Sequence, residues 1–179
     1  MQERTINMSA VLQASWGQTE IEGKALRQAL GRYPTGVAVV TTRTADGRPV
    51  GLTINSFASL SLAPALVLWS LVDRSPNLAA FQEAPHFAIS VLAQDQQGLA
   101  SRFANPAVTD KFDQVAVREA AEGVPVIEGA LATLVCRTSK YLTEGDHELF
   151  IGQVVRLDAR AGEPLVFHGG RFGALHMAG

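Results

Sequence analysis

Short runs of apolar and β-branched residues recur along the chain, separated by residues typical of turns. GVAVVTTR at 36–43 and VGLTI at 50–54 lie on either side of ADGRP. Asp46 and Gly47 are a favoured pair for a tight turn, so the two runs predict a hairpin. Further strands are expected at HFAISVL (86–92), at two long segments (130–142 and 147–160) joined by TEGD, at EPLVFH (163–168), and at ALVLWSLV (65–72), which is apolar throughout like a central barrel strand.

Three segments have apolar residues at helical spacing. PNLAAFQEA at 76–84 begins with proline, which is common in a first helical turn. DQQGLASRFA predicts a helix with Asp95 as its N-cap. A short amphipathic helix that ends before Pro34 is predicted by the spacing of Ala25, Leu26, Ala29, Leu30 and Tyr33.

The order of these elements indicates the fold class. The long strands are separated by tight turns or by one helix each and do not alternate regularly with helices, which favours an antiparallel barrel over a doubly wound parallel sheet. The chain is therefore expected to be mainly β with added helices. Residues 1–22 have no clear pattern and are expected to form an arm, with 23–179 as one domain. Within the arm, Trp16 and Ile21 could dock on the body or on a second subunit.

Composition narrows the possible functions. The formal net charge of −2 gives no basic field for a phosphate backbone, so no nucleic-acid binding is expected. No apolar run approaches the roughly 20 residues that span a bilayer. The N-terminus lacks the charged-then-apolar pattern of a secretory signal, and Cys136 is the single cysteine, so no internal disulfide can form. These features lead us to expect a soluble protein of the reducing cytoplasm.

Several common catalytic motifs are missing. Gly31 and Gly36 have the spacing that opens a phosphate-binding loop, but Val37 and Ala38 stand where lysine and a hydroxyl residue belong. No G-x-G-x-x-G follows a strand, and the four histidines are scattered, so neither a dinucleotide fingerprint nor a metal site is expected.

The candidate polar residues lie where predicted strands end. TINSFASLSLAP at 53–64 offers hydroxyls, a carboxamide and backbone N–H groups without a full charge, as an isoalloxazine ring requires. DRSPN at 73–77 precedes a helix and could bind a phosphate. GDH at 145–147 and FHGGRFG at 167–173 place histidine, arginine and aromatic residues at strand ends. Taken alone, each segment is what an ordinary turn, strand end or helix cap usually shows.

The order of these motifs is more specific than any one of them. YPTGVAVVTT, TINSFASLSLAP, RSPN, RFA…KF, GDH…GQV and HGGRFG together closely resemble the flavin reductase family, which supplies the reductase components of two-component flavin-dependent monooxygenases. The resemblance covers about Ala25 to Leu175. It implies a Greek-key split β-barrel of the FMN-binding type, working as a homodimer with flavin near the subunit interface. Pro64 is followed by Ala65, where many relatives have a second proline, and little functional effect is expected from this.

The resemblance also implies roles for individual residues. His147 is the candidate catalytic residue, expected to position the nicotinamide. The implied flavin-binding residues are Pro34, Thr35 and Gly36 at the first strand, Thr53, Asn55, Ser56, Phe57, Ser59 and Leu60 along the ring and ribityl chain, Arg74, Ser75 and Asn77 facing the phosphate, Phe103 and Lys111 bordering the cofactor, and Arg171 and Phe172 lining the opening.

The implied activity is an NAD(P)H:flavin oxidoreductase that transfers a hydride from NADH or NADPH to FMN or FAD and supplies a partner monooxygenase. Two other functions remain open. The chain could be a non-catalytic FMN-binding split-barrel module, or a structural barrel without a cofactor, because such barrels host several functions.

Overall fold

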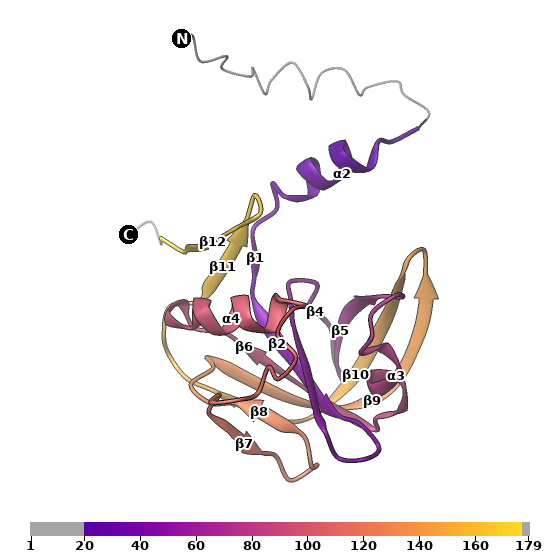
Figure 1. The fold of residues 1–179 in the computed structure, drawn as a ribbon, viewed down its shortest axis with the longest axis vertical. Helices are drawn as coiled ribbons and strands as arrows, with labels where there is room; N and C mark the ends of the chain where they lie inside the picture. Colours follow the sequence, from indigo (N-terminus) through magenta and orange to yellow (C-terminus); the bar gives the residue numbers. More distant parts are fainter. Residues whose placement is uncertain (1–19, 177–179) are drawn as a thin grey trace.

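The computed structural model describes residues 20–176, and a seven-stranded antiparallel sheet forms their centre (Figure 1). The strand order is β3-β2-β6-β9-β10-β5-β4, so the consecutive strands β3 and β4 are the two edges of the sheet. This confirms the mainly β, antiparallel class. The strands are β2 (Ala38–Arg43), β3 (Pro49–Ile54), β4 (Ala58–Leu62), β5 (Ala65–Val72), β6 (His86–Val91), β9 (Ala132–Glu144) and β10 (His147–Ala159).

The sheet curls around an apolar core. Trp69 of β5 stacks on Phe150 of β10, with ring centroids 4.6 Å apart, and meets Phe81 edge-on at 4.9 Å. Phe81 belongs to α3 (Leu78–Glu83), which therefore caps the same core. Because buried residues of β2, β3, β6 and β9 also join this cluster, six strands share one interior. Only alternate residues of β5 are fully buried, and the strand lies next to the edge strand β4, so its apolar run does not mark the centre of the sheet.

Strand β2 is buried on both faces, because every residue from Ala38 to Thr42 is buried. Val40 packs in the central core, while Val39 joins a second cluster that includes Ala100 and Phe103. These two residues belong to α4 (Gln97–Ala104), which follows the short 3-10 helix η1 (Gln94–Gln96). The expectation that Asp95 caps this helix is wrong, because α4 begins two residues later and has no side-chain cap.

Two small sheets complete the fold, and the sequence analysis missed part of each. β7 (Val117–Glu119) and β8 (Pro125–Ile127) form a hairpin in a stretch for which the sequence analysis predicted no strand. β1 (Thr35–Gly36), β11 (Leu165–His168) and β12 (Arg171–Ala174) form a three-stranded sheet in the order β1-β11-β12. The Gly169-Gly170 turn has positive φ angles of 57° and 81°, as in a type I′ hairpin turn.

Helix α2 (Gly23–Leu30) projects from the barrel beside the β11–β12 turn (Figure 1). It has the predicted amphipathic pattern, but none of its residues is buried. The expected arm lies almost wholly outside the described residues; Ile21, near its end, is exposed, and Trp16 is among the residues not described. No helix in residues 20–176 is long and apolar enough to cross a membrane.

Candidate functional site

The fold brings two of the predicted motifs together. The backbone N–H of Asp73 donates to the carbonyl of Asp146 at 3.0 Å, and His147 pairs with Val72 in the β5–β10 ladder. The loop at 73–77 therefore lies against the turn at 145–147. Arg74 is near enough to the Asp146 carboxylate to help lower its pKa. A cation, a serine and a histidine from distant parts of the sequence thus share one end of the barrel.

His147 is the first residue of β10, and its ring is held from one side. Its Nδ1 lies 2.7 Å from Asp146 Oδ1, and this contact is the main cause of the lowered pKa of Asp146. The imidazole is 46% exposed. When Nδ1 carries the proton to the carboxylate, Nε2 is left to face a ligand. Asp146 was not among the predicted site residues, although its position directly before the histidine could have indicated this role.

Ser75 and Asn77 shape the loop before α3. The Ser75 hydroxyl accepts a hydrogen bond from the Asn77 N–H at 3.3 Å, and the Ser75 carbonyl accepts one from the Leu78 N–H at 3.1 Å. Helix α3 begins at Leu78, so Ser75 lies slightly farther from the helix than the sequence predicted. The hydroxyl proton of Ser75 is still available to donate to an anion.

The β3–β4 connection is held to the barrel by Ser56. Its hydroxyl donates to the Ser70 carbonyl at 3.0 Å and accepts from the Ser70 N–H at 3.1 Å. Phe57 packs partly buried against the central core, whereas Asn55 is exposed. Ser59 and Leu60 follow on the exposed edge strand β4. Ser56 thus anchors this segment, and its neighbours present polar groups outward.

A second group of predicted residues surrounds α4. The Thr53 hydroxyl donates to the Ala100 carbonyl at 2.7 Å, and the Lys111 ammonium donates to the Phe103 carbonyl at 2.7 Å. Burial lowers the pKa of Lys111. Phe103 is fully buried, so its ring supports the wall of this region from inside.

The remaining predicted residues lie on the β1–β11–β12 sheet. The Thr35 hydroxyl is buried and has no hydrogen-bond partner among the described residues. Pro34 and Gly36 beside it are exposed. Phe172 packs edge-on against Phe167, with centroids 5.6 Å apart, and both contact the cluster that contains Phe103. Exposed Arg171 is beside the Gly169-Gly170 turn. These contacts connect the C-terminal motif to α4.

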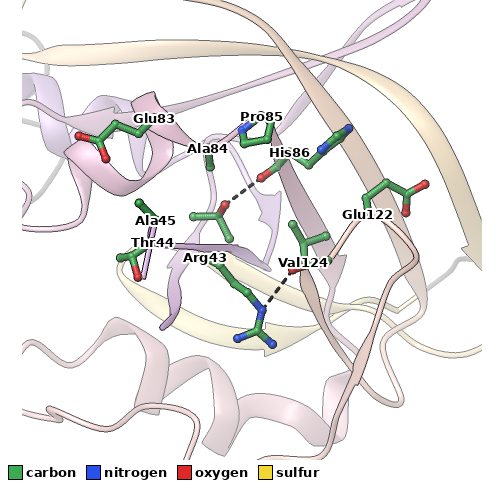
Figure 2. A pocket seen from close by; sticks show the side chains of 11 residues that line it. Arg43, Thr44, Ala45, Glu83, Ala84, Pro85, His86, Glu122 and Val124 are labelled. Atoms are coloured by element: carbon green, nitrogen blue, oxygen red, sulfur yellow. Dashed lines mark hydrogen bonds between the residues drawn. The ribbon is translucent and has the colours of Figure 1, made fainter. Parts of the chain in front are cut away.

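A separate hollow contains none of the predicted site residues. It has a volume of about 180 Å³ and lies between β2, the start of β6 and the β7–β8 turn (Figure 2). In it, Arg43 donates to the Gly123 carbonyl at 3.1 Å and Thr42 donates to the His86 carbonyl at 2.8 Å. The hollow is smaller than the roughly 300 Å³ at which small-molecule pockets begin, and its polar groups already hold the strands together.

An antiparallel barrel with uncharged donors, and with a cation–serine loop against a histidine turn, is the arrangement that a flavin-binding oxidoreductase requires. Comparison with known proteins makes the assignment specific. Residues 30–176 match the family model described as flavin reductase like domain, and the chain belongs to this family. The family inferred from the order of motifs is thereby confirmed.

Characterised relatives cover most of the chain. One is the FMN reductase (NADH) SmoA of Agrobacterium fabrum, 48% identical over 150 residues, which are 84% of each chain. Another is the NADH-dependent flavin reductase of a Rhodococcus species, 38% identical over 89% of this chain and 90% of its own. Among solved structures, the NADH:FAD oxidoreductase SgcE6 of Streptomyces globisporus, in complex with NAD and FAD fragments, is 36% identical with a TM-score of 0.82, covering 89% of this chain and 98% of that one.

The described residues fit a flavin. The unpartnered Thr35 hydroxyl and the outward carboxamide and hydroxyl of Asn55 and Ser59 can serve the polar edge of the ring. Phe57 offers an apolar wall. Arg74 and Ser75 offer a charge and a donor for a phosphate. These groups match what a flavin needs, which is uncharged donors for the ring and a positive charge for the phosphate.

Proposed function

We propose that this chain is an NAD(P)H-dependent flavin reductase, an enzyme that transfers a hydride from NADH or NADPH to FMN or FAD. The observation that carries the proposal is the Asp73–Asp146 backbone hydrogen bond, which joins the loop of Arg74 and Ser75 to the turn of His147. One motif can hold a flavin phosphate and the other can face a nicotinamide. The printed names of the relatives, which pair NADH with FMN or with flavin, support the same chemistry.

The residues of this chain would bind and orient the flavin and the nicotinamide nucleotide. The hydride acceptor itself is supplied by the flavin when it is bound. Ser75, Asn77 and Arg74 hold the phosphate. The segment that Ser56 anchors to β5 lies along the ring, and the Thr35 hydroxyl donates to its polar edge. His147, whose Nδ1–H is oriented by Asp146, would accept at Nε2 a hydrogen bond from the nicotinamide carboxamide N–H. Hydride transfer between the nucleotide and the flavin requires no protein nucleophile and no catalytic triad.

Lys111 and Phe103 would support the flavin-binding residues from the α4 side. The Lys111 ammonium is already bound to the Phe103 carbonyl, and burial disfavours its charge. Its contribution to a phosphate is therefore smaller than that of exposed Arg74. Arg171 and Phe172 border the opening from the β12 side.

The proposal includes a homodimer. The apolar side of α2 has no partner within residues 20–176: Leu26 is 46% exposed, Leu30 65% and neighbouring Tyr33 75%. An exposed apolar helix face of this kind is stabilised when another surface buries it. A second copy of the chain is the simplest such surface. Leu30→Ser should then raise the monomer fraction in light scattering at micromolar concentration. A wild-type protein that is monomeric under these conditions would refute the dimer.

The reduced flavin would serve a monooxygenase partner. The reductase component of a 4-nitrophenol monooxygenase system in Rhodococcus opacus is 41% identical over 147 residues, and this supports such a role. We place the protein in the cytoplasm. The single cysteine, Cys136, is buried and unpaired, which suits a reducing compartment.

Titration with flavin tests the proposal against a non-catalytic FMN-binding module. The enzyme should oxidise NADH or NADPH in proportion to added FMN or FAD, followed as the loss of nucleotide absorbance. Stoichiometric flavin binding with nucleotide oxidation no faster than in the protein-free control would favour the module instead.

A further inference from the structure

A strongly basic groove lies between α2 and the β11–β12 turn. Its volume is about 660 Å³, within the range of small-molecule sites. Five basic residues line it, and no aspartate or glutamate does. This concentration is unexpected in a chain whose formal net charge is −2. The basic residues are Lys24, Arg27, Arg32, His168 and Arg171.

The groove has a defined shape because its two walls are tied together. The Gly169 N–H donates to the Gly31 carbonyl at 2.9 Å, which fixes the end of α2 beside the hairpin turn (Figure 1). Lys24 and Arg27 are three residues apart on α2 and therefore share one side of the helix. Both walls consequently present their cations to the same space.

These cations are not neutralised by the protein itself. Within residues 20–176, none of the five basic residues takes part in an ion pair. Clustered like charges repel one another, and an anion that enters between them relieves that repulsion. Arginine forks suit phosphoryl oxygens in particular, because two parallel N–H groups match two oxygens.

We propose that this groove binds the pyrophosphate of an adenine dinucleotide. The inference rests on the proposed function, since both NAD(P)H and FAD carry this group. Arg171 links the groove to the predicted cofactor opening, while Lys24, Arg27, Arg32 and His168 extend the binding surface beyond the residues that the motifs indicate. Sequence analysis missed this site because its two walls come from opposite ends of the chain.

Calorimetric titration with ADP and with inorganic pyrophosphate tests the proposal without requiring activity. The double variant Lys24→Gln/Arg27→Gln should bind ADP about tenfold more weakly than the wild type, because two of the facing charges are gone. The matched control is Arg48→Gln/Lys140→Gln, which removes the same two residue types from exposed positions outside the groove. It should stay within about twofold of the wild type, and higher salt should weaken wild-type binding.

Two further measurements on the double variant show whether the pyrophosphate belongs to the pyridine nucleotide or to FAD. A raised KM for NADH with FMN as acceptor assigns the groove to the pyridine nucleotide, whereas weaker binding of FAD but not of FMN assigns it to FAD. Either result supports the proposal. Because no residue of α2 is buried, the double variant should fold normally, and Arg171→Gln on the other wall provides an independent test.

Equal ADP affinity in the double variant, Arg171→Gln and the control would overturn the proposal, as would undetectable ADP binding by the wild type. So would a change in dimer mass without a change in ADP affinity, which would assign the groove to an acidic surface of a second copy. If ADP binding is lost as predicted but the wild type cannot reduce flavin, the flavin reductase assignment fails and the phosphoryl site remains. Normal flavin reduction with unchanged ADP affinity refutes the groove alone.

Discussion

Replacing His147 by alanine should slow flavin reduction while leaving flavin bound. The ring makes one side-chain hydrogen bond in the described structure, from Nδ1 to Asp146 Oδ1 at 2.7 Å, and it is 46% exposed. The stability of the fold should therefore change little. Loss of the proposed Nε2 acceptor removes one hydrogen bond to the nucleotide, worth about 1–3 kcal/mol, so kcat/KM for NADH should fall roughly ten- to a hundredfold.

Steady-state kinetics and flavin titration on the same variant separate the possible roles. The KM for NADH should rise, and the dissociation constant of flavin should remain near that of the wild type. Asp146→Asn is a matched control that keeps the turn but weakens the hold on Nδ1, so its loss should be smaller. Wild-type kinetics in His147→Ala would remove the residue from the site. Loss of flavin affinity alone would place it on the flavin side instead.

Three further predictions concern packing, thiol chemistry and the phosphate. In Gly152→Ala the new Cβ would collide with the Phe87 ring and lie 2.8 Å from Cys136 Cβ, and overpacking of this kind costs about 1–3 kcal/mol. Calorimetry should show a Tm lower by at least about 2 °C, while Gly98→Ala, whose Cβ meets nothing within 4 Å, should hold or raise it. Burial raises the pKa of Cys136 to about 12, so a thiol reagent at pH 8 should label it only after unfolding; rapid labelling of the native protein would contradict this. Ser75→Ala should weaken FMN binding about tenfold and leave riboflavin binding unchanged, and equal effects on both ligands would place the phosphate elsewhere.

The sequence predicted the strands that carry strong apolar patterns. The 36–43 and 50–54 runs form the β2–β3 hairpin, and the two long segments form β9 and β10. Edge strand β4 was missed because it is short and contains two serines, which resemble a loop in composition. The β7–β8 hairpin has only three residues in each strand, too few for a periodic pattern to be recognised.

The parts of the candidate site that are formed by neighbours in sequence could be predicted. The contacts between residues far apart in the sequence could not. The order of the motifs indicated the family, which the comparison confirmed. No local pattern could indicate that Ser56 bonds to Ser70, or that the loop at 73–77 meets the turn at 145–147, because strand pairing decides both contacts. Likewise, the partner of Lys111 is a backbone carbonyl, which no side-chain motif records.

Anaerobic rapid mixing tests the central claim most directly. Purified protein with FMN or FAD is mixed with NADH, and with NADH carrying deuterium at the transferred C4 position, while flavin bleaching is followed. The account predicts bleaching far faster than in the protein-free mixture, and slower with the deuterated nucleotide, because the C4–hydrogen bond breaks in the step that reduces the flavin. Flavin that binds but bleaches no faster than in the protein-free mixture would contradict the account.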